Sequence, residues 1–232
     1  MLVVRGLHAG YGDAEVLFGI DLDVAAGEVV TLLGRNGMGK TTTVSAIMGL
    51  IPARAGTVTV NGTDLTNAPP FRLAQAGIGL VPEGRQVFPT LTVEENLIAT
   101  AAARFGAPRW SLARTYAFLP RLAERKANRG NELSGGEQQM LAIGRALMTN
   151  PRLIILDEAT EGLAPIIRAE IWSCLAALKA EGEAILVIDK NIDALTRLAD
   201  RHVVIEKGHV VWSGRNAELI ADGAVRESYL HL

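Results

Sequence analysis

The chain has 232 residues, of which 49% are hydrophobic and 21% charged, so it can bury a sizeable core. Its formal net charge of −2 gives no electrostatic reason to expect nucleic acid as a partner. The single cysteine, Cys174, excludes an internal disulfide, and no apolar run approaches the roughly 20 residues of a membrane-spanning helix.

The first part of the chain has the pattern of strands joined by turns. Residues 2–7 and 16–24 are rich in apolar side chains and flank a turn around Gly12. Residues 56–60 predict a further strand that ends at Asn61-Gly62, a strong signal for a tight turn. We therefore expect an antiparallel β subdomain in this region.

A phosphate-binding loop of the form G-x-x-x-x-G-K-[ST] lies between a predicted buried strand, 29–33, and a predicted helix, 43–50. Glycines let the backbone turn its N–H groups toward an anion, and the helix N-terminus adds further donors. Lys40 can reach the β- and γ-phosphates of ATP, and the Thr41 hydroxyl can ligate Mg²⁺. The run consists of Gly34, Arg35, Asn36, Gly37, Met38, Gly39, Lys40, Thr41 and Thr42.

Beyond a short predicted strand at 78–82, the pattern becomes helical. Thr92 and Glu95 form a capping box that predicts a helix through Ala103. Shorter helices are expected at 109–118 and 120–126. Because residues 84–150 interrupt the alternation of strand and helix, we expect an inserted helical subdomain there. Residues 1–83 and 151–232 would then form the nucleotide-binding core with its β subdomain, within one α/β domain of 1–232.

The segment Leu133-Ser134-Gly135-Gly136-Glu137-Gln138-Gln139 contains a second capping box, from Ser134 to Glu137, and opens an amphipathic helix. After it, the pattern predicts strands at 153–156 and 184–188, a helix at 166–180, a hairpin over 203–212 and a helical tail over 217–232.

Two acids, Asp157 and Glu158, follow the predicted buried strand at the edge where open α/β sheets bind ligands. Beside a phosphate loop this pair indicates hydrolysis of a magnesium nucleotide. Asp157 would hold Mg²⁺ through its water shell, and Glu158 would polarise the water that attacks the γ-phosphate. The alternative is a solvated acidic turn at the end of a strand.

The segment from Leu133 to Gln139 resembles the signature sequence of ABC-type ATPases, and the other elements stand in that family's order along the whole chain. The resemblance implies the ABC ATPase fold, ATP hydrolysis, and a head-to-tail dimer. In that dimer Ser134, Gly135 and Gly136 would contact the γ-phosphate of ATP bound by the opposite subunit. Tyr11 stands where the family has an aromatic residue that stacks on adenine; the alternative is a core tyrosine.

Three positions depart from the general ABC pattern. Glu83 replaces a glutamine, and would either reach Mg²⁺ and its waters or be an exposed hinge residue. Lys190 stands at the position of a histidine that contacts the γ-phosphate, because its ten-residue spacing to Asp200 fits the family; the alternative is a solvated loop lysine. Ala164 replaces an aspartate that crosses the dimer interface in many relatives.

These departures, with Val81-Pro82-Glu83-Gly84-Arg85, resemble the ATP-binding subunits of branched-chain and hydrophobic amino-acid uptake systems. That resemblance implies two transmembrane permease subunits, a second and related ATPase subunit, and an external solute-binding protein. A homodimer of the isolated chain is the alternative to a heterodimer, and the sequence does not decide between them. The chain would lie on the cytoplasmic side of the membrane, held by the permease. The alternatives are export of a lipid or polysaccharide, a non-transport ABC ATPase, and a nucleotide-gated regulator.

Overall fold

The structure is a computed structural model that describes residues 1–230. Among these residues, no helix combines the length and the apolar character needed to cross a membrane. The strands are β1 (Leu2–Tyr11), β2 (Ala14–Val24), β3 (Val29–Leu33), β4 (Ala53–Val60), β5 (Thr63–Asp64), β6 (Ile78–Val81), β7 (Leu153–Asp157), β8 (Ala184–Ile188), β9 (Arg201–Glu206) and β10 (His209–Arg215). The helices are α1 (Lys40–Ile47), α2 (Pro70–Gln75), α3 (Val93–Ala99), α4 (Leu112–Phe118), α5 (Pro120–Glu124), α6 (Gly135–Met148), α7 (Pro165–Ala180), α8 (Ile192–Leu198), α9 (Asn216–Ala221) and α10 (Gly223–Val225), with a 3₁₀ turn at Gly130–Glu132 and a π-helix at Arg226–Leu230.

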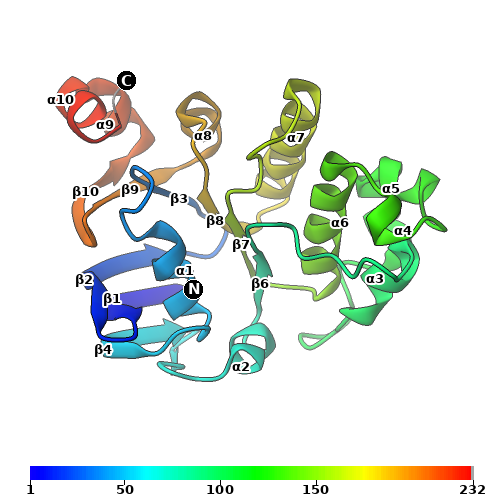
Figure 1. Ribbon diagram of the computed structural model, residues 1–232, viewed down its shortest axis with the longest axis horizontal. Helices are drawn as coiled ribbons and strands as arrows, with labels where there is room; N and C mark the ends of the chain where they lie inside the picture. The colour runs from blue at the N-terminus through cyan, green and yellow to red at the C-terminus, as the bar shows by residue number, and fades with distance from the viewer. Residues whose placement is uncertain (231–232) are drawn as a thin grey trace.

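The central sheet has six strands in the order β10-β9-β3-β8-β7-β6, and all but β10 run parallel (Figure 1). Every residue of β3, β7 and β8 is buried. A parallel sheet that is covered on both faces requires such continuous apolar strands. The carboxyl ends of these parallel strands therefore open at one edge of the sheet, where the predicted site residues follow them.

The predicted antiparallel subdomain is confirmed as a second sheet, in the order β2-β1-β4-β5. Its inward side chains join helix α1 and the central sheet in one apolar cluster, which includes Leu7, Leu17, Ile47 and Ile155. The two sheets thus share a core, and helix α1 lies between them (Figure 1).

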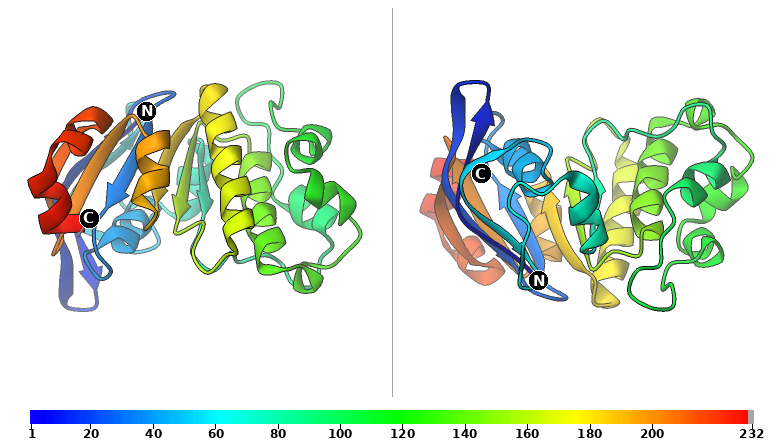
Figure 2. Two further views of the ribbon diagram at one scale, coloured as in Figure 1. Left: turned by 90° about the horizontal axis from the view of Figure 1, so that it is seen from above. Right: turned by 90° about the horizontal axis from the view of Figure 1, so that it is seen from below.

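Helices α3 to α6 gather at one end of the molecule, and α9 and α10 lie at the other end (Figure 2). Helix α6 belongs to two apolar clusters. Met140, Leu141 and Met148 pack with α3 and α5, whereas Ile143 and Leu147 pack with β7 and α7. Helix α6 therefore packs both against the other helices of this end and against the sheet.

Two helix boundaries in this region differ from the prediction, and Asn150 explains both. Helix α3 ends at Ala99 rather than Ala103, because the backbone leaves the helix and the Ala102 N–H donates to the Met148 carbonyl (3.0 Å). Helix α4 begins at Leu112 rather than residue 109. The Asn150 amide donates to the Ala102 carbonyl (2.9 Å) and accepts from the Trp110 N–H (2.6 Å), which holds both connecting segments outside helical geometry.

Smaller differences concern helix ends. The helix after the phosphate loop begins at Lys40 and ends at Ile47, and α5 ends at Glu124 instead of residue 126. The tail predicted as one helix is divided, because α9 ends before Asp222. Residues 231–232 of that prediction lie outside the described part of the chain. Both predicted capping boxes, at Thr92 and Ser134, are confirmed.

Candidate functional site

The phosphate loop connects the carboxyl end of β3 to the first residue of α1. Gly34 has φ 144°, and a Cβ there would lie 2.3 Å from the Ile205 carbonyl oxygen, so only glycine fits. Gly39 is the N-cap of α1 in a left-handed conformation, with φ 105° and no side-chain cap. The N–H groups of the first helical turn are consequently left to meet an anion.

Lys40 lies inside this loop, and the residue is only 5% exposed. Its Nζ donates to the carbonyls of Gly34 (2.8 Å) and Arg35 (2.9 Å), and burial lowers the pKa of the ammonium. The loop therefore holds the charged end of Lys40 over its own backbone, where incoming phosphate oxygens can accept from the same donor.

Thr41 and Asp157 supply oxygen atoms beside the loop. The Thr41 hydroxyl lies 3.5 Å from Asp157 Oδ1, and Asp157 is 3% exposed. Burial raises the pKa of Asp157 to about 6, with a further increase from the charge of Glu83. A hydroxyl and carboxylates are the donor set that Mg²⁺ prefers, so these residues fit the predicted ion.

Glu158 begins the segment after β7 and has a left-handed φ of 50°. Its N–H donates to the Ile188 carbonyl (2.9 Å), which fixes the backbone against β8. Burial raises the pKa of the Glu158 carboxyl to about 7, and a hydrogen bond with Glu161 acts in the same direction. A carboxyl with a pKa near neutrality is suited to general-base chemistry.

Lys190 pairs with two carboxylates instead of extending alone into solvent. Its Nζ lies 3.5 Å from Glu158 Oε2 and contacts Glu161 Oε1 more closely. The Lys190 side chain is nevertheless 45% exposed. The side chain is thus both solvated and paired with carboxylates, so the alternative of a solvated loop lysine and the contact with a γ-phosphate both stay predictions.

One cavity of about 310 Å³ brings together predicted residues from four separate parts of the sequence. The phosphate loop forms one side, and segments that follow β6, β7 and β8 form the other. Its lining residues are Val16, Asn36, Gly37, Gly39, Lys40, Thr41, Thr42, Glu83, Glu158, Glu161 and Lys190. Glu83, Glu158 and Glu161 place carboxylate oxygens within 4.8 Å of one another.

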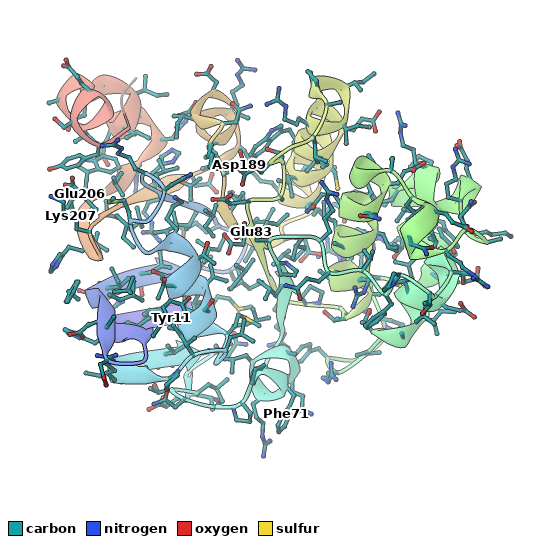
Figure 3. All side chains as sticks on the ribbon, viewed as in Figure 1. Tyr11, Phe71, Glu83, Asp189, Glu206 and Lys207 are labelled. Carbon is teal, nitrogen blue, oxygen red and sulfur yellow. The ribbon has the colours of Figure 1, made fainter. Side chains whose placement is uncertain are left out.

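Two residues of this site, Glu161 and Asp189, are not among those predicted from the sequence. Asp189 is 8% exposed and accepts from the Thr160 hydroxyl (2.6 Å) and N–H (3.2 Å). It thereby joins the segment after β7 to the segment after β8. Figure 3 shows Asp189 and Glu83 in the middle of the molecule, near the carboxyl edge of the sheet. For Asp189 the available signal was a polar residue directly after the predicted strand 184–188, whereas Glu161 had no such signal.

Ser134, Gly135 and Gly136 lie elsewhere. The Ser134 hydroxyl accepts from the Glu137 N–H (3.3 Å) at the start of α6, and a Cβ on Gly135 would lie 2.9 Å from Arg85 Nη1. Within residues 1–230, none of the three lines the phosphate-loop cavity. A single chain therefore does not bring its signature segment to its own phosphate loop.

Tyr11 and Met38 complete the predicted set. Tyr11 is 52% exposed at the end of β1 (Figure 3), so the alternative of a core tyrosine is wrong. Stacking of Tyr11 on adenine stays a prediction. The Met38 side chain packs against the core and its sulfur accepts from the Lys207 N–H (3.2 Å). The Met38 N–H donates to the Arg35 carbonyl (3.4 Å) and its carbonyl accepts from the Gly208 N–H (3.0 Å), so contact of Met38 with a phosphate stays a prediction.

The chain matches the family described as ABC transporter over residues 17–161. It is 40% identical to the high-affinity branched-chain amino acid transport ATP-binding protein BraG of Pseudomonas aeruginosa, over 99% of both chains. It is also 32% identical to the lipopolysaccharide export system ATP-binding protein LptB of Escherichia coli, over 99% of this chain and 96% of that protein.

Solved structures agree with these similarities. A nucleotide-free ATP-binding cassette from an ABC transporter superimposes with a TM-score of 0.85 at 28% identity, covering 100% of this chain and 98% of that chain. The dimeric structure of a bacterial ABC transporter cassette gives a TM-score of 0.80 at 26% identity, covering 93% and 99%. Cassettes of this kind bind and hydrolyse ATP, dimerise and work with transmembrane domains. The chain therefore belongs to the ABC transporter family, as an ATP-hydrolysing cassette with the α/β fold and antiparallel β subdomain predicted from its sequence.

Proposed function

We propose that this chain powers the import of branched-chain or other hydrophobic amino acids through a membrane permease. The observation that carries the proposal is its 40% identity, over nearly its whole length, to a branched-chain amino acid transport ATPase. The lipopolysaccharide export ATPase matches over the same share of this chain, 99%, but at the lower identity of 32%. The three departures at Glu83, Lys190 and Ala164 support the same choice, because they resemble the uptake group.

In this proposal MgATP occupies the cavity beside the phosphate loop. Lys40 donates to the phosphates, Thr41, Asp157 and Glu83 hold Mg²⁺ and its waters, and Tyr11 stacks on adenine. Glu158 takes a proton from the attacking water, at a carboxyl whose pKa burial has already raised to about 7.

The second half of the site would come from another ATPase subunit, as the position of Ser134 outside the cavity supports. An N-cap serine followed by two glycines forms an anion site of its own at the start of α6. Closure of a head-to-tail dimer would bring this helix end to the partner's γ-phosphate. In the working complex the partner would be a second, related ATPase subunit, so the dimer would be a heterodimer.

The helical part, which we place at 84–150, would move against the core, 1–83 and 151–232, when the dimer closes. The permease would dock near 83–92, where the two parts meet. Gln86, at the start of the helical part, is held to α6 of the same part, because its carbonyl accepts from Arg145 Nη1 (2.6 Å). An external binding protein would deliver the solute, and the chain would lie on the cytoplasmic side of the membrane.

A transport assay tests the proposal. The chain is expressed with the permease, second ATPase and binding protein encoded beside it, and uptake of labelled leucine and labelled glutamate is measured. We expect ATP-dependent leucine uptake that disappears in Glu158→Gln, with little glutamate uptake. Gentle membrane extraction should recover the permease with the chain.

Export of a lipopolysaccharide or lipid is the second candidate, favoured by the 32% similarity to the export ATPase. It predicts that the same complex lacks amino-acid uptake and instead transfers labelled lipopolysaccharide out of the inner membrane. Recovery of no permease at all would contradict both transport functions.

A further inference from the structure

Three charged side chains form a compact cluster where the segments after β7 and β8 meet. Lys190 Nζ contacts Glu161 Oε1 and lies 3.5 Å from Glu158 Oε2. The exposures differ, since the Glu161 and Lys190 side chains are 49% and 45% exposed whereas the Glu158 side chain is 12% exposed. Glu161 therefore approaches Lys190 from solvent, and Glu158 faces the cavity.

The backbone beneath this cluster is well fixed. Asp189 accepts from both the N–H and the hydroxyl of Thr160, and Glu158 donates its N–H to Ile188. These bonds set where the two segments lie. They do not set the direction of the Glu158 carboxylate, which depends on groups at its own end of the side chain.

When Glu158 is ionised, as a base must be, it cannot donate a hydrogen bond to Glu161 and it lies among like charges. Oxygens of Glu83, Glu158 and Glu161 come within 4.8 Å of one another, an arrangement that drives ionised carboxylates apart. An ammonium shared by Glu158 and Glu161 offsets this repulsion. Glu161 makes the closer of the two contacts with Lys190. Without the Glu161 carboxylate, Lys190 would keep only the more distant contact, with Glu158.

We propose that Glu161 is a positioning residue for ATP hydrolysis, which holds Lys190 against Glu158 and thereby fixes the direction of the Glu158 carboxylate at the cavity. The proposal rests on the role of Glu158 as the base. It gives Lys190 a function that does not require contact with the γ-phosphate. It also explains why both residues line the phosphate cavity while their ion pair is half exposed.

Such an exposed ion pair contributes little to stability, so its loss should be visible in catalysis and not in folding. The test uses the full chain assembled with its partner subunits and compares Glu161→Gln, Glu161→Asp, Lys190→Ala and the double variant Glu161→Gln/Lys190→Ala. Asp23→Asn is the matched control, because it breaks an exposed ion pair with Arg5 in the β subdomain. The readouts are kcat, the KM for ATP and the thermal midpoint.

We expect Glu161→Gln to lower kcat about tenfold with the KM for ATP and the thermal midpoint unchanged, since a misdirected catalytic group affects turnover. Glu161→Asp should recover part of the loss. Lys190→Ala should lower kcat to a similar extent, and the double variant should be no slower than the slower single variant. Asp23→Asn should behave as the unmodified chain.

Unchanged or increased kcat in Glu161→Gln, while Glu158→Gln is inactive, would overturn the proposal and leave Glu158 as the base. Losses that multiply in the double variant would overturn it as well, because Glu161 and Lys190 would then act separately. Full activity of Glu158→Gln would overturn both this proposal and the role of Glu158.

Discussion

Two glutamates lie at opposite edges of the central sheet, and burial raises the pKa of both. Glu183 directly precedes β8 and is 4% exposed. It accepts from Trp110 Nε1 (3.2 Å) and pairs with Arg109 Nη1 (2.9 Å). Glu158 follows β7 at the other edge and lines a cavity, where Lys190 lies 3.5 Å away.

The comparison distinguishes a carboxylate that stabilises the fold from a carboxylate that can take part in a reaction. Glu183 is held from two sides by groups near α4, so its charge ties the helical end of the molecule to the sheet. Glu158 has an open side toward the phosphate loop, where a water and a nucleotide can approach. Glu183 also borders a cavity, of about 380 Å³, so neither a raised pKa nor an adjacent cavity marks the site by itself. The phosphate loop on the opposite side of the cavity distinguishes Glu158 from Glu183.

The largest expected effect is on turnover. Glu158→Gln keeps the shape of the side chain but removes the proton acceptor, so ATP hydrolysis should fall about 10²- to 10⁴-fold while ATP binding is kept. Glu183→Gln is the matched control and should hydrolyse ATP at the unmodified rate. Measurement of kcat and of nucleotide affinity checks both variants. If both variants lost the same amount of ATP turnover, the assignment of a catalytic role to Glu158 and a structural role to Glu183 would be wrong.

The next effect is on stability. Glu183→Ala would leave the indole N–H of Trp110, a residue that is 1% exposed, without its acceptor, and Arg109 would lose one of its carboxylate partners. The free energy of unfolding should fall by about 1–3 kcal/mol. Denaturant titration measures this change, and hydrolysis at low temperature should stay near the unmodified rate. A large loss of turnover in the folded variant would instead assign Glu183 a part in coupling the helical end to the site.

Much of this architecture follows from local sequence signals. The phosphate loop, the two capping boxes and the apolar strands before Glu158 and Asp189 each depend on neighbouring residues, and the structure contains all of them. The parallel pairing of Asp157 with Ile188 then brings the segments after β7 and β8 together, which the order of strand and helix predicts only in outline.

The rest depends on contacts between distant residues. Asn150 ends α3 and delays α4 through bonds to Ala102 and Trp110, which lie 48 and 40 residues away. Glu161 had no signal of its own, because its importance comes from Lys190 on another segment. The assignments of Ser134 to a partner's ATP and of Tyr11 to adenine concern molecules beyond this chain, and they stay predictions.

The smallest expected effect is the pH dependence of stability without nucleotide or Mg²⁺. Burial raises the pKa of Glu158 from its ordinary 4.5 to about 7, so the folded protein holds a proton that the unfolded chain has released. The contribution of this proton to the free energy of unfolding is complete below the ordinary pKa of 4.5, and it is lost as the pH rises from there through 7. Between pH 5.5 and 8 the unmodified chain should lose on the order of 1 kcal/mol more stability than Glu158→Gln.

Denaturant titrations of the two proteins at both pH values measure this difference. Asp157, whose pKa burial raises to about 6, contributes a loss in the same direction, but it is present in both proteins and cancels. Glu183→Gln is again the control, because its own pH-dependent contribution comes from the opposite edge of the sheet. If the unmodified chain and Glu158→Gln lost equal stability, Glu158 would already be ionised before nucleotide binds. Lys190 would then be the dominant influence on its charge, and the phosphate loop across the cavity, not the pKa, would distinguish Glu158 from Glu183.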